Sequence, residues 1–192
     1  GLMADPAYIV DGVLTDGEAW VGIAHASLSL PAAVVTWTST DDGQTGDFSQ
    51  YMDLVVIQYV KGASSGTYSK LNFNNDTSSN YAFQHFYGTG AAAVAGTGTT
   101  TYFDGAWYPN SGTANVFGVA VTHLFDINSG KYKSGTSAVA RDSDGSGYVV
   151  LTAVTWKSQA PITEIDIVDS AGANFIAGCT FSLFGILPRM VA

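Results

Sequence analysis

Histidines are the side chains of this sequence best suited to bind a metal or to move a proton. His25, His85 and His123 lie far apart, each inside a run of residues typical of a β-strand. A zinc site needs three or four nitrogen, sulfur or oxygen ligands that converge, and neither C-x-x-C nor H-x-x-x-H occurs. The sequence therefore predicts no metal site at the histidines and places them on partly exposed strand faces or at an interface.

Serine and cysteine are the candidate nucleophiles. A Ser-His-Asp site is defined by geometry and not by sequence spacing, and because serines are plentiful, chance pairings with a histidine are expected. Cys179 lies in the apolar run FIAGCTFSL, whereas a reactive thiol needs an electropositive and accessible site. We therefore interpret Cys179 as a small buried apolar residue and assign no nucleophile.

Aspartate and asparagine residues in three turn-like segments could offer oxygen ligands to calcium. These segments are DDGQTGD at 41–47, NNDTSSN at 74–80 and RDSDGSGY at 141–148. The spacing of Asp142 and Asp144 departs from D-x-[DN]-x-[DN]-G-x5-E, and no glutamate follows at the required distance. Tight polar turns account for all three segments, so no calcium site is predicted.

Paired carboxylates would be required for glycoside hydrolysis, facing one cleft about 5 to 9.5 Å apart. Glutamate occurs only at Glu18 and Glu164, so aspartates would have to serve, and no feature of the sequence selects a pair. The sequence thus identifies no catalytic residue, no metal ligand and no cofactor, and we expect a protein that is not an enzyme.

Aromatic side chains offer binding instead of catalysis. Trp107 and Tyr108 lie in the loop-like segment YFDGAWYPN, where exposed rings could stack on sugars or anchor a protein interface. The alternative is that both rings fold back onto the core. Trp20, Trp37 and Trp156 stand in strand-like runs, which predicts that these three are core residues.

Strands are the elements that must position these side chains. Glycine, which weakens helices, is frequent at 22 residues, and no segment shows capped helical periodicity. Short runs of β-branched and aromatic residues alternate with turns, which predicts eight or nine strands. Residues 51–60 are apolar on both strand faces, so we expect a central strand there. Residues 89–115 are predicted to form long loops or a hairpin arm.

The C-terminal segment, residues 162–186, is the clearest pair of strands. Ile165 and Ile167 share one face of the first strand and Glu164 and Asp166 the other, which predicts one face on the core and one in water. The second run, FIAGCTFSLFGI, is apolar on both faces. We expect the interior of the fold to cover one of these faces and a neighbouring subunit to cover the other.

Composition limits the class of protein. The 192 residues suffice for one domain with a substantial core. Charged residues make up 12%, against about 25% in a typical soluble domain. The net charge of −9 disfavours binding to nucleic acid or to anionic membranes, and no apolar run approaches the roughly 20 residues of a membrane span.

Together these patterns predict an all-β chain: a single-domain β-sandwich, jelly-roll-like, with long loops and an N-terminal arm. Residues 1–30 are expected to form the arm and the first strand, and residues 31–192 the sandwich. No repeat of 20–50 residues is visible in the sequence, which excludes propellers and solenoids.

Two segments follow more specific patterns. LNFNNDTSSNYAF, at 71–83, contains F-N-x-D, a short turn and N-Y, and residues 162–186 contain I-x-x-I-x-I, then G-x-N-F-x-x-G and S-L-F-G-I. With the strand QYMDLVVIQYV at 50–60, they resemble a group of tailed-bacteriophage virion structural proteins, β-sandwich components of capsid decoration, fibre or tail structures. The resemblance spans about residues 50–186.

The resemblance implies a structural role at the surface of a virion capsid, assembled in the cytoplasm of a bacterial host. Decoration, or cement, proteins of this kind often sit as homotrimers and clamp neighbouring subunits of the major capsid protein. The implied partners are therefore the major capsid protein and copies of the chain itself. We place the interface at five apolar residues: Phe103, Trp107, Tyr108, Phe184 and Ile186.

Two other functions remain as alternatives. One is a fibre- or tail-associated module that recognises a host glycan through AWYPN, at 106–110, and through Ser/Thr-rich loops. The other is a carbohydrate-active or esterase-like enzyme, for which the sequence selects no residues.

Overall fold

The structure of the chain, a computed structural model, consists almost entirely of strands. It describes residues 9–10, 13–14, 20–63, 68–109, 114–143 and 145–187, the first two pairs by their backbone alone. Its elements are β1 (Ile9–Val10), β2 (Val13–Leu14), β3 (Trp20–Ser27), β4 (Val34–Thr38), the 3-10 turn η1 (Phe48–Gln50), β5 (Asp53–Val60), β6 (Tyr68–Phe73), β7 (Tyr81–Gly88), β8 (Ala93–Thr100), β9 (Phe103–Trp107), β10 (Gly118–Phe125), β11 (Lys133–Asp142), β12 (Gly147–Trp156), β13 (Glu164–Asp169) and β14 (Thr180–Ile186).

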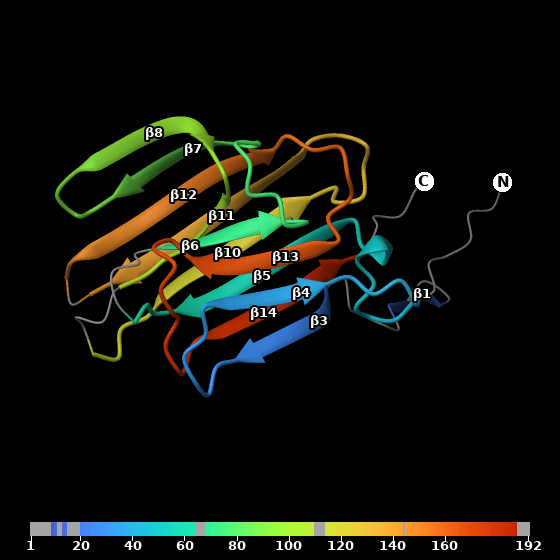
Figure 1. Cartoon of the computed structure of the whole chain (residues 1–192), viewed down its shortest axis with the longest axis horizontal. Coiled ribbons are helices and arrows are strands. Elements are labelled where there is room, and N and C mark those ends of the chain that lie inside the picture. Colours follow the sequence, from blue (N-terminus) through green and yellow to red (C-terminus); the bar gives the residue numbers. More distant parts are fainter. Residues whose placement is uncertain are drawn as a thin grey trace.

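Two antiparallel sheets pack together and form the body of the molecule (Figure 1). The larger sheet has eight strands in the order β3-β14-β5-β10-β11-β12-β7-β8, and the smaller has four in the order β4-β13-β6-β9. β1 and β2 pair separately. The predicted all-β class and β-sandwich are confirmed, while the jelly-roll-like topology stays a prediction.

Alternating side chains from the two sheets meet to form the core. In β13, Ile165 and Ile167 are fully buried while Glu164 and Asp166 are partly exposed, as the alternation predicts. In β14, Phe181 points into the same core. Because a strand side chain changes face at every residue, the apolar half of each pattern fixes which side of the strand meets the other sheet.

β5 is a central strand, as predicted for residues 51–60. It lies between β14 and β10, and its inward side chains Leu54, Val56 and Val60 are fully buried. Its other face is only partly covered, since Val55 is buried and Tyr59 is exposed. Both faces of β5 are apolar, but only the inward face is buried along the whole strand.

Residues 89–115 contain two strands, β8 and β9. The prediction of long loops is therefore wrong for these two parts of the segment. The alternative, a hairpin arm within 89–115, holds only in part, because β8 is one strand of a hairpin whose other strand, β7, precedes this segment. The small residues of β8 have a packing reason. A Cβ at Gly96 would lie 2.7 Å from Nε2 of His85, so a ring of β7 occupies the space that a side chain would need.

β3, which lies within the predicted N-terminal arm, belongs to the body of the molecule. β3 pairs with β14 at one edge of the larger sheet, and its residues Val21 and Ala26 pack against the core. The predicted arm, residues 1–30, thus contains a strand of the sandwich from Trp20 onward. The side chains of residues 1–19 lie outside the described part of the structure.

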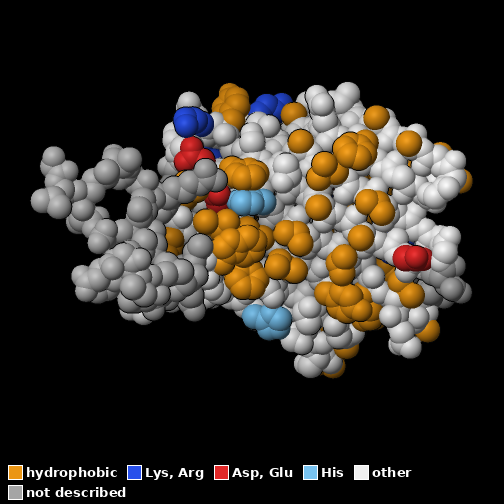
Figure 2. All heavy atoms as spheres, turned by 180° about the vertical axis from the view of Figure 1, so that it is seen from behind, with side chains coloured by type: hydrophobic (Ala, Val, Ile, Leu, Met, Phe, Trp, Pro, Cys, Tyr) orange, Lys and Arg blue, Asp and Glu red, His pale blue; other side chains and the backbone are white. Residues whose placement is uncertain are grey.

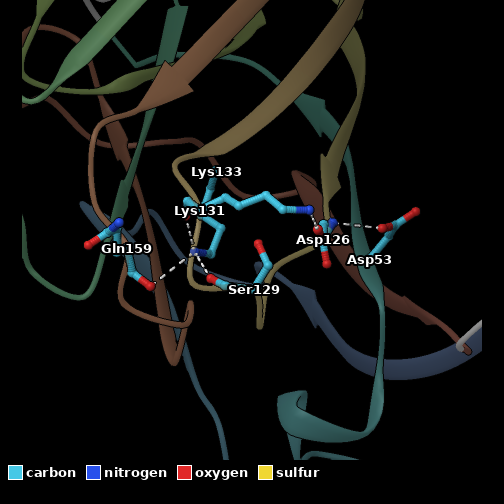
Figure 3. A network of polar contacts seen from close by, with 6 residues as sticks. All are labelled: Asp53, Asp126, Ser129, Lys131, Lys133 and Gln159. Atoms are coloured by element: carbon cyan, nitrogen blue, oxygen red, sulfur yellow. Dashed lines mark hydrogen bonds and ion pairs between the residues drawn. The ribbon is translucent and has the colours of Figure 1, made fainter.

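A buried lysine joins the loops at one end of the sandwich (Figure 3). Lys133 begins β11, and its Nζ donates to three backbone carbonyls, those of Ser129 (2.5 Å), Lys131 (2.6 Å) and Gln159 (3.3 Å). Burial lowers the pKa of this amine because desolvation disfavours the charged form. The three carbonyls supply the partners that a buried ammonium group requires.

Candidate functional site

The larger sheet turns one face toward the smaller sheet and leaves most of the opposite face, called here the outer face, to solvent. On β10, the buried Ala120 and Thr122 alternate with the exposed Val119 and Val121. The same alternation in the other strands brings further large apolar side chains to this side. The exposed large apolar residues of the outer face are Trp20, Tyr59, Phe86, Val119, Val121, Phe125, Val149 and Leu151.

Charged side chains are almost absent from the outer face. Counted by the strand alternation, the outward positions of the eight strands hold only two charged residues, Asp53 and Asp142. Asp53 is nearly buried, and Asp142 is the last residue of β11. Figure 2 shows this side of the molecule, with hydrophobic side chains spread across it and few charged ones. The acidic chain thus carries its charge elsewhere.

Small residues on β11 leave a groove in the outer face. Ala138 and Ala140 form the floor of a groove of about 390 Å³ between the taller side chains of β10 and β12. A second groove of about 570 Å³ lies over β12, β7 and β8, where Phe86 and Leu151 stand beside Ala95. The surface therefore offers ridges and hollows that another protein's side chains could fill.

Two of the three histidines lie on the outer face. His123 Nε2 lies 2.9 Å from Oδ2 of Asp53, and its ring stacks on Phe125 at 4.0 Å between centroids. Asp53 also accepts the N–H of Asp126 at 2.8 Å (Figure 3). His25 is exposed, and its Nδ1 lies 2.9 Å from the hydroxyl of Ser182. Both match the predicted strand histidines.

His85 lies on the opposite side of its strand, next to the smaller sheet. Its Nδ1 is 3.9 Å from Oδ2 of Asp104, and its ring packs beside Phe83 and Trp107. Burial raises the pKa of the Asp104 carboxyl, and His85 offsets part of this effect. The structure does not bring the three histidines together.

The five predicted interface residues divide between the core and the outer face. Phe184 and Ile186 occupy outward positions of β14, and the ring of Trp20 packs on Phe184 at 6.1 Å. Phe103 and Tyr108 are fully buried, which corrects their assignment to an interface. Trp20 is 47% exposed, so the prediction of a core residue is wrong there, whereas Trp156 is buried.

Tyr108 serves the core because its hydroxyl finds buried partners. It donates a short hydrogen bond to Asp169 and lies 2.9 Å from the carbonyl oxygen of Tyr68. Its ring packs against Phe175. Burial, and then the neighbouring Asp169 carboxylate, raise the pKa of this phenol. The sequence around it reads as a loop, and only the tertiary contact with β13 reveals the buried position.

Trp107 is partly buried in a cluster of rings. Its centroid lies 5.3 Å from that of Tyr87 and 5.4 Å from that of Tyr148, and His85 meets it edge-on at 6.1 Å. Arg141 lies over the ring of Tyr148 at 4.7 Å. Since a platform for sugars needs an open ring face, the geometry favours packing between the two sheets as the role of Trp107.

The aspartates of the acidic turns accept hydrogen bonds from nearby protein groups, including backbone N–H groups of the same turn. Asp76 accepts hydrogen bonds from Trp156 Nε1 (2.7 Å), from Asn80 (2.9 Å) and from the N–H of Ser78 (2.9 Å). Asp47 caps η1 by accepting from the N–H of Ser49. Within the described residues, no group of three or more His, Cys, Asp or Glu side chains is arranged to hold a metal ion.

The chain contains one serine pattern besides the nucleophiles considered above. Residues 62–66, GASSG, match the G-x-S-x-G pattern of hydrolases, in which the serine follows a strand and opens a helix. Here the pattern joins two strands, β5 and β6, and both serines lie outside the described residues. Cys179 is buried, as predicted, and its Sγ accepts from the N–H of Lys61 at 3.3 Å.

Comparisons with protein-family models, with curated proteins and with solved structures find no match for this chain. In the part of the chain that the structure describes, no helix has the length and apolarity to cross a membrane. The outer face is thus the feature from which a function can be argued.

Proposed function

We propose that the chain is a structural assembly protein, not an enzyme, which packs its outer face against other protein subunits and thereby decorates or cements a phage capsid. The outer face carries the proposal. It is exposed and apolar, and it almost lacks charge on a chain of net charge −9. Exposed apolar patches larger than a few hundred Å² mark interaction sites on soluble proteins.

The size of the outer face agrees with a stable protein contact. Eight strands spaced about 4.8 Å apart and about eight residues long cover roughly 900 Å². A standard interface buries about 800 Å² on each partner. Burial of such a surface gives a large gross gain, much of which is offset by the cost of association. Repeated copies around a shell then add avidity.

The capsid as the place of assembly is supported by the resemblance of residues 71–83 and 162–186 to virion structural proteins. The first segment forms β6, a turn and the start of β7, and the second forms β13 and β14. The expected partners are the major capsid protein and copies of the chain, with a homotrimer as the expected form. A host glycan is the second candidate ligand, but the two rings expected to bind it are not open, since Tyr108 is fully buried and Trp107 packs among other rings.

The location of the protein on particles tests the place of assembly. Antibodies raised against the purified chain are applied to particles of the phage that encodes it, and gold labelling is viewed by electron microscopy. We expect label over the head surface. Label confined to the tail tip would favour the glycan-recognition alternative, and particles without any label would overturn the virion role.

A matched pair of variants tests the outer face. Val121 on the outer face and Val34 on the smaller sheet are 44% and 46% exposed, so Val121→Asp and Val34→Asp place the same charge at equal exposure on opposite faces. Cosedimentation with heads that lack the protein is the measurement. We expect Val121→Asp to weaken binding at least about tenfold, or roughly 1.4 kcal/mol, and Val34→Asp to bind like the parent. Equal binding of both variants contradicts the proposal.

A further inference from the structure

The free edge of β8 carries a second contact that does not depend on the outer face. We propose that β8 pairs with β8 of a second copy of the chain in an antiparallel, two-fold contact, so that two eight-stranded sheets join into one. The occupant of this edge is therefore the same strand of another molecule, and the chain has a contact with itself in addition to its contact with a shell.

Among the described strands, β8 is an edge without protection. It ends the larger sheet, with β7 as its hydrogen-bonded neighbour among the described strands, and pairs with β7 over eight residues without a register shift. Natural edge strands are usually short or carry charges, proline or a bulge, because open backbone groups pair with other chains. The sequence of β8, AVAGTGTT, contains none of these devices.

The other described edges of the two sheets are less suited to pairing. β3 carries a bulge opposite Leu183 and Phe184, β9 shifts register against β6, and β4 has five residues. β8 is long and regular, and neither β8 nor its neighbour β7 contains Asp, Glu, Lys or Arg. Residues 77–103 form the longest stretch of the chain without Asp, Glu, Lys or Arg. Two acidic molecules can therefore approach each other here with the least repulsion.

The turn before β8 fixes which of its backbone groups are free. The N–H of Thr89 donates to the carbonyl of Ala92 at 3.0 Å, so this pair is hydrogen-bonded. Hydrogen-bonded and open pairs alternate along an antiparallel ladder, and the next bonded pair is therefore Tyr87 with Val94. It follows that the N–H and C=O groups of the alternate β8 residues point away from β7. These residues are Ala93, Ala95, Thr97 and Thr99.

This set of residues is complementary to itself. When two β8 strands run antiparallel about a two-fold axis at Gly96, Ala95 lies opposite Thr97 of the second copy, and Ala93 lies opposite Thr99. All four residues present their free groups to the partner. Opposed residues of an antiparallel pair point to the same side of the sheet, so the outer faces of the two copies become one continuous surface.

A proline at the free edge tests the contact. Ala95→Pro removes an N–H that points away from β7, which an edge strand tolerates, and Ala95→Ser keeps that N–H as the matched control. Light scattering on an eluting peak measures the mass. We expect the parent and Ala95→Ser to have twice the mass of Ala95→Pro: a dimer of 20.0 kDa chains where β8 is the sole self-contact, and a pair of trimers where the homotrimer also forms. We expect Ala95→Pro to keep an unchanged melting profile. A parent of single mass overturns the inference.

Amide hydrogen exchange provides a test that does not depend on how the proline variant folds. In the parent protein, we expect the amides of Ala95 and Thr97 to exchange more slowly as the concentration rises, while Gly96 and Gly98 are protected at every concentration. Fast exchange of Ala95 and Thr97 throughout would overturn the inference.

The two proposals fail separately. If Val121→Asp loses binding to heads while the parent has the mass of one chain, then the outer-face proposal stands and the β8 contact is wrong. If Ala95→Pro separates the copies while Val121→Asp binds heads like the parent, then the β8 contact stands and the outer-face proposal is wrong. A two-fold contact gives even numbers of chains, so a lone trimer that Ala95→Pro leaves intact also contradicts it.

Discussion

The two sheets of the sandwich each turn one face to solvent, and these two faces differ in composition. The outward side of the smaller sheet carries Glu164 and Asp166, which accept hydrogen bonds from Thr38 and Thr36. The outward side of the larger sheet carries valines, leucine and aromatic rings in the corresponding places. The same chain therefore builds one face that suits water and one that does not.

The difference shows that the apolar outer face is not a requirement of the fold. An antiparallel sheet needs apolar side chains only on the side that faces the core, and β13 meets this need with alternate isoleucines. β10 and β12 carry apolar side chains on both sides. The outward apolar side chains are not fully covered by any described residue of the chain. A contact with another molecule would bury them and thus explain why they are apolar.

The largest expected effect tests the core on which both faces rest. Phe73 packs against Tyr81, Phe103 and Trp156, with centroids 5.6 to 6.0 Å away. We expect Phe73→Ala to lower the free energy of unfolding by about 3–5 kcal/mol, as measured by urea denaturation. Phe86→Ala on the outer face is the matched control, with a loss of about 1 kcal/mol or less. Equal losses would mean that the outer face is part of the core.

A smaller effect is expected at the Asp76 turn, which joins β6 and β7 beneath the core. Asp76→Asn keeps the shape of the side chain but replaces one acceptor oxygen, so a bond from Trp156, Asn80 or Ser78 is lost. We expect a loss of about 1–3 kcal/mol in the same denaturation experiment. Asn80→Ala removes one of these bonds and should cost less. A larger loss for Asn80→Ala would contradict this order.

The Asp104 carboxyl gives a pH-dependent effect. Because burial raises its pKa above the usual 3.8, the folded protein holds this proton more tightly than the unfolded chain. The resulting stabilisation is present below pH 3.8 and is lost as the pH rises through the folded-state pKa. The stability of the parent relative to Asp104→Asn should therefore fall from acidic to neutral pH in a series of urea titrations. A difference that is flat or rises would refute this assignment.

The smallest expected effect on stability is at Leu151, in the middle of the outer face. Its side chain is 42% exposed, so Leu151→Ser should change the free energy of unfolding by about 0.5 kcal/mol or less. The same variant should bind heads more weakly than the parent. A large loss of stability with unchanged binding would remove the distinction between the two solvent faces.

The sequence predicts those elements whose residues alternate clearly. The pattern of Ile165 and Ile167 against Glu164 and Asp166 identifies β13 and its buried face, and the apolar run at 51–60 identifies β5. The small residues of β8 mislead, because Gly96 reads as loop until His85 is known to fill the space beside it. No local pattern distinguishes these two situations.

The candidate site is predicted less well than the fold. Phe184 and Ile186 are found on the outer face because their run is apolar on both sides. Tyr108 is misplaced, since its burial depends on Asp169, which is distant in sequence. The outer face as a whole is missed because it combines single residues from eight strands, and the order of those strands is a tertiary property that the sequence pattern does not contain.

The unequal number of strands in the two sheets has a mechanical consequence. The hairpin of β7 and β8 lies at the end of the larger sheet (Figure 1), and on its inner side the rings of Tyr87, Trp107 and Tyr148 are in mutual contact. Segments with few buried neighbours open at the lowest free energy. Under mechanical force, the sandwich should therefore begin to unfold at this hairpin. A strand that pairs with β8 would stabilise the part of the sheet that otherwise opens first.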